Sequence, residues 1–231
     1  MIETGTTVED QHKRPRMVFG KDRHEIPYSE RLRGGQEHNR TLAIVEKSIA
    51  EEGEPFLYAE ELRKVALQFP DAPSISVIDG GCGYGLMLEE MRSLEPYIGK
   101  KIDTTGVTLE EEEAENLSQK DIDSIFIGSV QEYYKKMNGQ KKFHFILDSH
   151  GAAYYDWGKG VEWMVKEGEN IIPLYADLLY PQGRAFLSFA LTYPGYGEVG
   201  RNNVLSLLER NNLQITREMN KGEYFSVQKR T

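Results

Sequence analysis

The sequence predicts a doubly wound α/β fold, with helices on both faces of a mostly parallel sheet. The first observation behind this prediction is a strand–turn–helix unit. The apolar run 75–78 leads through a glycine-rich turn into a helical pattern over 86–94. The second observation is that short β-branched runs and amphipathic stretches keep alternating from there to the C-terminus. Such alternation is typical of a parallel sheet, because each parallel strand needs a crossover helix before the next one.

The remaining elements are assigned from the same patterns. Two helices are expected before the first strand, at 34–52 and 57–69, and the second ends before Pro70. Further strands are expected at 101–109, 124–128, 142–148 and 183–190. Further helices are expected at 110–119, 130–137 and 203–211, with a long helical region at 156–179 that Gly168 and Pro173 interrupt. The chain should close with a hairpin, 213–219 and 224–229, around Asn220-Lys221-Gly222.

The turn after the first strand is where the sequence predicts a ligand. Asp79 and Gly80 end the strand, and Gly81, Gly83 and Gly85 follow at two-residue spacing. Glycine allows positive φ and lets a ligand approach the backbone closely. At the carboxyl end of a parallel sheet, backbone N–H groups and a helix N-terminus face a crevice. We therefore expect a nucleoside-type cofactor at this turn.

The spacing of the glycines distinguishes between cofactors. The dinucleotide pattern G-x-G-x-x-G fails in every frame, which disfavours an NAD-dependent oxidoreductase. The pattern Asp79-x-Gly81-x-Gly83-x-Gly85 instead resembles motif I of the class I S-adenosylmethionine (SAM)-dependent methyltransferases. The stretch Leu179–Arg184 is also similar to that family's common loop of the form L-x-P-G-G-x.

The resemblance covers about residues 71–231 and implies an architecture. It implies a seven-stranded sheet in the order 3-2-1-4-5-7-6, with an antiparallel seventh strand that the closing hairpin would supply. Residues 71–231 would form the SAM-binding domain, and residues 1–70 an N-terminal segment with a helical lid. A second lid element is expected at Thr192–Glu198, which is long and rich in glycine and aromatic residues.

The resemblance also implies how the cofactor is held. Asp79 would hold the amino-acid moiety of SAM, directly or through water. The glycines would leave room for the methionine and ribose portions; they are Gly80, Gly81, Gly83 and Gly85. Leu109 after the second strand, and Asp148 and Ser149 after the fourth, are expected to line the same cofactor.

Two positions depart from the family's usual pattern. Thr108 stands where the family often carries a ribose-binding acid, although cyclopropane-fatty-acid-synthase-like members also have Gly-Val-Thr-Leu there. One hydroxyl cannot replace a bidentate carboxylate, so ribose contact would fall partly to Glu110 or to water. Ser129 stands where the family often has an adenine-binding Asp, and the adenine would be held by Ser129 and the backbone of Val130.

The segment after the fourth strand is expected to face the substrate. Small residues at 151–153 would leave room for it, and Tyr154 could form part of a pocket wall. His150 has the pKa range of a general base, or it could pack against the cofactor or cap the loop. Tyr28 and Tyr193 are further candidates for substrate binding, and Tyr28 is equally compatible with ordinary packing.

Composition and absent motifs narrow the function. The net charge of −9 argues against a nucleic-acid binder, and the chain lacks the Asn/Asp-Pro-Pro-Tyr/Phe loop of methyltransferases that act on exocyclic or amide nitrogens. Its single cysteine, Cys82, lies within the glycine turn, which argues against cytosine C5 chemistry and against a cysteine-based zinc site. No apolar run is long enough to span a membrane, and no secretory signal is evident, so a cytoplasmic location is expected.

These observations lead to a SAM-dependent methyltransferase that acts on a small molecule, with no metal, nucleic acid or membrane involved. The main alternative is a non-catalytic SAM-binding partner subunit or scaffold, because the ribose and adenine positions are atypical. An aminopropyltransferase would need an acidic pair after the fourth strand, where only Asp148 is present. The acceptor atom stays open between O, N and C, and a homodimer stays open as well.

Overall fold

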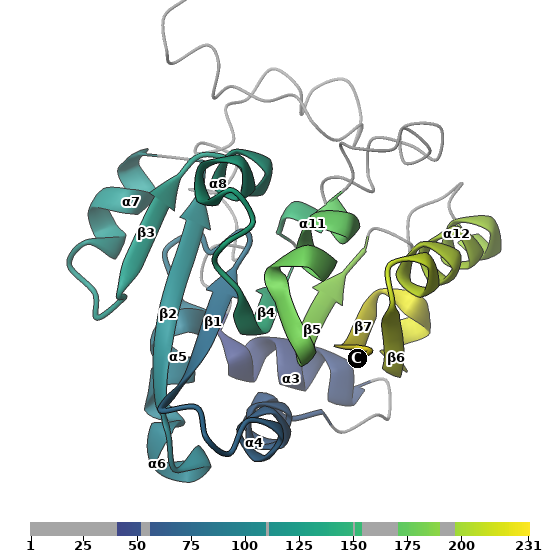
Figure 1. Ribbon diagram of the computed structural model, residues 1–231, viewed down its shortest axis with the longest axis horizontal. Helices are drawn as coiled ribbons and strands as arrows, with labels where there is room; N and C mark the ends of the chain where they lie inside the picture. The colour runs from purple at the N-terminus through teal and green to yellow at the C-terminus, as the bar shows by residue number, and fades with distance from the viewer. Residues whose placement is uncertain (1–40, 52–55, 110, 150, 154–170, 190–196) are drawn as a thin grey trace, which may run out of the picture.

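The computed structural model describes residues 41–51, 56–109, 111–149, 151–153, 171–189 and 197–231. They form a seven-stranded sheet with helices on both faces (Figure 1). The strand order is β3-β2-β1-β4-β5-β7-β6, which confirms the order implied by the sequence resemblance. The first five strands run parallel, whereas β7 is antiparallel to both β5 and β6.

The strands follow the apolar runs of the sequence. Their bounds are Ser74–Asp79 (β1), Lys101–Thr108 (β2), Ser124–Ile127 (β3), Phe143–Asp148 (β4), Leu179–Ser188 (β5), Leu213–Met219 (β6) and Tyr224–Lys229 (β7). The two central strands β1 and β4 are buried along most of their length, as is expected for parallel strands that are covered on both faces. The short 3-10 helix η3 (Asn220–Gly222) joins β6 to β7 and confirms the predicted hairpin.

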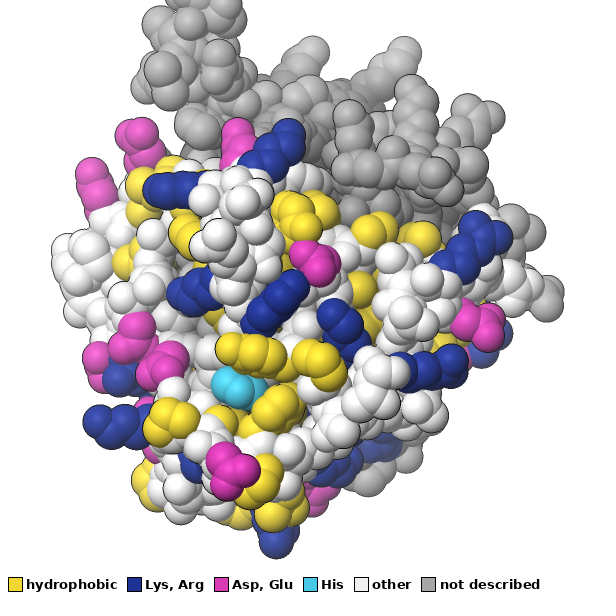
Figure 2. All heavy atoms as spheres, viewed as in Figure 1, with side chains coloured by type: hydrophobic (Ala, Val, Ile, Leu, Met, Phe, Trp, Pro, Cys, Tyr) yellow, Lys and Arg dark blue, Asp and Glu magenta, His cyan; other side chains and the backbone are white. Residues whose placement is uncertain are grey.

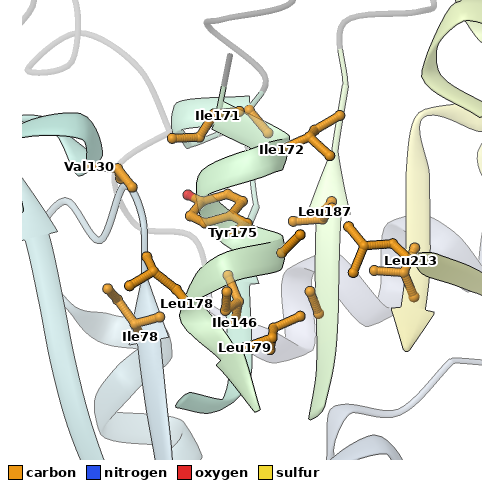
Figure 3. Packing of buried hydrophobic residues seen from close by; sticks show 14 of the residues in the cluster. Ile78, Val130, Ile146, Ile171, Ile172, Tyr175, Leu178, Leu179, Leu187 and Leu213 are labelled. Atoms are coloured by element: carbon orange, nitrogen blue, oxygen red, sulfur yellow. The ribbon is translucent and has the colours of Figure 1, made fainter. Parts of the chain in front are cut away.

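The helices divide between two hydrophobic clusters, one on each face of the sheet. Their bounds are Leu42–Glu51 (α3), Tyr58–Gln68 (α4), Leu86–Ser93 (α5), Glu95–Ile98 (α6), Glu111–Leu117 (α7), Val130–Met137 (α8), Ile171–Leu178 (α11) and Gly197–Arg210 (α12). The cluster that we call the α11 cluster receives buried side chains from α8, α11 and α12 (Figure 3). The α5 cluster, on the other face, receives them from α3, α4, α5 and α7.

Strand β4 shows how the sheet separates the two clusters. Ile146 points into the α11 cluster, whereas its neighbours Phe145 and Leu147 belong to the α5 cluster. All three side chains are completely buried. Successive strand residues point to opposite faces, so an uninterrupted apolar run is what a strand between two cores requires.

A buried ion pair ties α4 to the C-terminal half of the sheet. The Arg184 guanidinium on β5 lies 2.8–2.9 Å from Glu61 on α4, and both side chains are more than nine-tenths buried. Arg184 also donates to Thr216 on β6 at 2.9 Å, and Ser226 on β7 donates to Glu61 at 3.0 Å. With these partners, the charges can be buried without being left unsatisfied.

Three predicted boundaries were wrong. Helix α11 runs through Pro173 instead of being interrupted there, because Pro173 lies in its first turn, where a missing N–H removes no helical hydrogen bond. Strand β5 begins at Leu179, so the predicted loop 179–184 lies within the strand, at an irregularity in its pairing with β4 where Gln182 has a φ of 67°. Helix α12 begins at Gly197, so the end of the predicted second lid, 197–198, is helical.

The described part of the predicted N-terminal lid packs on the sheet. Helix α4 contacts α6, which directly precedes β2. Figure 1 shows α4 near the start of β2. Just past its end, the Phe69 ring lies 4.6 Å from the His144 ring at the beginning of β4. The Tyr180 ring lies 4.7 Å from the His144 ring as well, and Figure 2 shows hydrophobic side chains gathered around a histidine on this face. The end of α4 therefore lies where parallel strands begin, away from the ends where a ligand is expected. Residues 1–40 lie outside the described part of the chain.

Among the described residues, no helix combines the length and the apolar composition that crossing a membrane requires.

Candidate functional site

The candidate site lies at the edge where the parallel strands end, which we call the carboxyl edge. Asp79, Thr108 and Asp148 are the last residues of β1, β2 and β4. Strand β1 pairs with β2 on one side and β4 on the other, with Asp79 opposite Gly106 and Leu147. The three polar side chains that the sequence singled out are therefore brought together at one edge, and all three are buried.

The turn between β1 and α5, which we call the glycine loop (residues 80–85), uses its glycines in two ways. Gly83 and Gly85 have φ values of +49° and +72°, in the left-handed region that glycine adopts without strain. At Gly85 a Cβ would lie 2.3 Å from a methyl carbon of Leu117, so this glycine also allows α7 to pack closely. At Gly83 a Cβ would meet, among the described residues, only a carboxylate oxygen of Glu113, at 3.9 Å. The described residues therefore leave the space beside Gly83 open, with a carboxylate at its border.

Gly80 and Gly81 serve close packing within the protein. A Cβ on Gly80 would lie 1.7 Å from the Tyr175 hydroxyl, and one on Gly81 would lie 2.5 Å from the Cα of Gly151. The loop that follows β4 thus lies directly against the glycine loop. Cys82 is buried and packs against Gly106, where a Cβ would lie 2.8 Å from its sulfur. Burial raises the pKa of the Cys82 thiol, so it is not poised to act as a nucleophile.

The two buried aspartates of the carboxyl edge differ in their hydrogen bonds. Asp148 accepts backbone N–H bonds from Gly151 at 3.0 Å and Ala153 at 2.9 Å, and the Tyr175 hydroxyl donates to it at 2.5 Å. Asp79 accepts one bond, from the Gly81 N–H at 3.1 Å, and has no other partner among the described residues. Burial, together with repulsion from Asp148, raises the pKa of Asp79 to about 8. Asp79 is thus the carboxyl group with capacity left for a ligand.

Thr108 is joined by an acid that the sequence analysis did not identify. Its hydroxyl donates to the carboxylate of Glu113, which α7 places beside the end of β2. Glu113 is 95% buried, and its other carboxylate oxygen is the one that faces Gly83. The carboxylate that is missing at position 108 is therefore supplied by Glu113 of the following helix. The sequence signal that could have identified Glu113 was the run of four acids at 110–113. From the sequence alone, such a run is explained by the favourable interaction of acids with the N-terminal end of the helix dipole.

Ser129 has a structural task at the start of α8. Its hydroxyl accepts from the Glu132 N–H at 3.2 Å, and its backbone N–H donates to the Glu132 carboxylate at 2.7 Å, which completes a capping box. The hydroxyl also donates to that carboxylate, at 2.8 Å. The hydroxyl keeps one lone pair for a ligand. Val130 follows as the first helical residue, and Leu109 follows β2 as a half-buried residue. The predicted cofactor roles of Ser129, Val130 and Leu109 stay predictions.

Ser149, directly after β4, is 92% buried, and its hydroxyl has no hydrogen-bond partner among the residues that the structure describes. The predicted substrate residues lie outside the described part of the chain; they are Tyr28, His150, Tyr154 and Tyr193, and the same holds for Glu110. Among the described residues, no group of three or more His, Cys, Asp or Glu side chains could hold a metal ion.

Comparison with known proteins adds information on the fold. No protein-family profile and no curated protein matches the sequence. Among solved structures, the plantazolicin methyltransferase BpumL in complex with SAH is 17% identical, with a TM-score of 0.52 over 84% of this chain and 76% of that one. A putative caffeoyl-CoA O-methyltransferase from Staphylococcus aureus is 14% identical, with a TM-score of 0.48 over 86% and 97% of the two chains. Together with the strand order, the likeness to BpumL shows that this chain has the class I methyltransferase fold.

Proposed function

We propose that this protein is a SAM-dependent methyltransferase that acts on a small molecule. The observation that carries the proposal is the space that the described residues leave open beside Gly83, bordered by the Glu113 carboxylate, at the carboxyl edge of a sheet with the methyltransferase strand order. Two vicinal hydroxyl groups are a good partner for a carboxylate that can accept two hydrogen bonds. A ribose therefore fits this position, and Glu113 would bind it together with Thr108.

The other described residues of the site fit the rest of SAM. Asp79 has an unused carboxylate oxygen suited to an alkylammonium group, as the sequence resemblance implied. The adenine would lie near Ser129 and the backbone N–H of Val130, at the start of α8. When bound, SAM supplies a methyl group on a sulfonium centre; the acceptor atom forms a bond to this carbon while the carbon–sulfur bond breaks and its electron pair stays on sulfur.

The chain's own contribution to transfer would be alignment and, at His150, proton removal. The tight contact of Gly81 with Gly151 keeps Gly151 against the glycine loop. His150 directly precedes Gly151 in the sequence, and we propose that it takes the proton of an O–H or N–H acceptor. The net charge of −9 supports a small molecule over a nucleic acid as the acceptor, and the composition supports a cytoplasmic location.

Calorimetric titration with SAM and with S-adenosylhomocysteine tests the cofactor. We expect both to bind, NAD not to bind, and Gly83→Leu to abolish SAM binding, because the new side chain would fill the open space. Gly99→Leu is the matched control. Gly99 also has a positive φ, +72°, and no described atom lies within 4 Å of its Cβ position, but it is at the end of α6, before β2. Both variants therefore carry the same kind of backbone strain.

Equal loss of SAM binding in Gly83→Leu and Gly99→Leu would mean that strain, and not the open space, explains the result. Binding of NAD without SAM would contradict the proposed cofactor. Turnover is tested separately, by release of S-adenosylhomocysteine in the presence of small-molecule acceptors. Tight SAM binding without turnover on any acceptor would instead favour the non-catalytic partner subunit.

A further inference from the structure

Tyr175, Asp148 and Asp79 form a buried cluster beneath the glycine loop. The Tyr175 hydroxyl fills the position next to Gly80 and donates to Asp148 on β4 at 2.5 Å. Asp148 is completely buried and accepts two backbone N–H bonds besides. Asp79 ends the neighbouring strand β1, is 97% buried and accepts a single backbone N–H bond. Figure 3 shows the Tyr175 ring on α11, among the side chains of the α11 cluster.

Two carboxyl groups buried side by side do not both ionise easily, because their charges repel and neither is solvated by water. Hydrogen-bond donors decide which of the two keeps the charge. Among the described residues, Asp148 has at least three donors and Asp79 has one, so the charge belongs on Asp148 and the proton on Asp79. The Tyr175 hydroxyl is the one side-chain donor in this set.

We propose that Tyr175 is a positioning residue that acts through Asp148: it keeps one proton on Asp79, and this proton is released when the ammonium group of SAM binds there. The inference rests on the proposed function, because it takes SAM as the cofactor. In the step itself, the Asp79 carboxyl loses its proton to the solvent, and the resulting carboxylate pairs with the alkylammonium. SAM affinity therefore rises with pH. It stops rising at the pH where Asp79 is already ionised in the ligand-free protein.

The other ionisable groups around Asp79 are consistent with this coupling. Burial is the main reason that the pKa of Asp79 is raised to about 8, and Asp148 raises it further. Cys82 in the glycine loop has a raised pKa as well, so the thiol brings no negative charge near neutral pH. Glu113 on α7 adds a further acidic group on the side of Gly83. No described basic side chain is among the causes that shift the pKa of Asp79.

Calorimetric titration with SAM in buffers of different ionisation enthalpy measures the released protons directly. At pH 7 a carboxyl group with a pKa of about 8 is about nine-tenths protonated, so we expect nearly one proton to be released per SAM bound. SAM affinity should increase by up to about tenfold from pH 6 to pH 7. 5′-Methylthioadenosine, which lacks the amino-acid end of SAM, should release none. Asp79→Asn should release none with either compound.

Tyr175→Phe tests the positioning role. Without the hydroxyl, Asp148 holds its charge less well and takes a larger share of the proton, so fewer protons should be released and the pH dependence of SAM affinity should flatten. Tyr133→Phe is the matched control, because Tyr133 is also buried in the α11 cluster but its hydroxyl has no hydrogen-bond partner in the described part of the chain. It should leave the proton count unchanged. A purely structural role of Tyr175 would weaken SAM binding equally at every pH, with the wild-type proton count.

The possible failures are distinguishable. If wild-type protein binds SAM without releasing a proton, this inference is overturned and the proposed function stands. If SAM does not bind at any pH, the proposed function itself fails. Should Tyr175→Phe not fold, NMR titration of the Asp79 carboxyl carbon in the wild-type protein replaces it. A midpoint above pH 7 that disappears on SAM addition supports the inference, and a midpoint near pH 4 overturns it.

Discussion

Replacing Asp79 with Asn should change how the stability of the protein depends on pH. The Asp79 carboxyl has a pKa of about 8 in the folded protein, whereas in an unfolded chain an aspartate has a pKa of about 3.9. Between these two values the folded state binds more protons than the unfolded state. The stability that this raised pKa provides is therefore complete below about pH 4 and is lost as pH rises towards 8.

The folded state binds one more proton than the unfolded state over this pH range, and this sets how strongly the free energy of unfolding depends on pH. Each pH unit within this range should lower the free energy of unfolding by about 1.4 kcal/mol, which gives roughly 2.5 kcal/mol between pH 5 and pH 7. Because Asp79 is almost completely buried, solvent screening reduces this little. A typical domain has only about 5–15 kcal/mol of stability in total. Asparagine has nearly the same shape and cannot ionise, so the variant should gain stability relative to the wild type as pH rises.

Urea unfolding of both proteins at pH 5, 6, 7 and 8, without SAM, measures this difference. Lowered pKa values of Glu61, Asp123 and Asp177 also contribute to the pH dependence, but they are present in both proteins and cancel. Asp177→Asn serves as a control, because a carboxyl group with a lowered pKa stays ionised over this range and should give a constant difference. If the difference for Asp79→Asn is also constant from pH 5 to pH 8, then Asp79 carries no proton and the reasoning is refuted.

Three further predictions concern other parts of the molecule. Glu113→Ala should weaken SAM binding roughly 10–100-fold in calorimetry, which is the scale of hydrogen bonds to a charged group, and Glu113→Gln should weaken it less. Equal SAM affinity of the wild type and both variants would remove Glu113 from the site. Arg184→Leu should lower the free energy of unfolding by about 3–5 kcal/mol, because it leaves the buried Glu61 carboxylate without its arginine. Adding Glu61→Leu should recover part of this loss. A loss under about 1 kcal/mol in urea unfolding would contradict the prediction. His150→Ala should leave SAM affinity nearly unchanged and lower turnover about 10²–10⁴-fold, with partial recovery at high pH; full turnover would exclude a general base there.

The sequence predicted best those elements that carry local signals at both ends. Helix α8 has the predicted bounds, Val130–Met137, because Ser129 forms a capping box before it and Asn138 takes the left-handed conformation after it. Strand β1 was predicted from its apolar run and the glycines that follow. The start of β5 was missed, because residues 180–182 are exposed and lie at the irregularity between Leu179 and Arg184, the two positions where β5 pairs with β4 on either side of it.

The candidate site was predicted in part for a similar reason. Asp79 and Asp148 could be placed at the carboxyl edge, since each ends an apolar run and the ends of parallel strands lie together. Glu113 was missed because it is one of several consecutive acids, and only the packing of α7 against the glycine loop selects it. Tyr175 was missed because it lies 27 positions after Asp148 in the chain, and its role depends on how α11 packs on the sheet.

The sequence by itself determined the type of fold, the order of its elements and the position of the glycine turn. These depend on hydrophobic periodicity, on turn residues and on glycine spacing, all of which act between residues close together in the chain. Only the tertiary structure decided which acid lies beside Gly83, and which of the two buried aspartates is fully hydrogen-bonded. Burial and charge repulsion depend on distances between residues that are far apart in the chain, and folding alone brings those residues together.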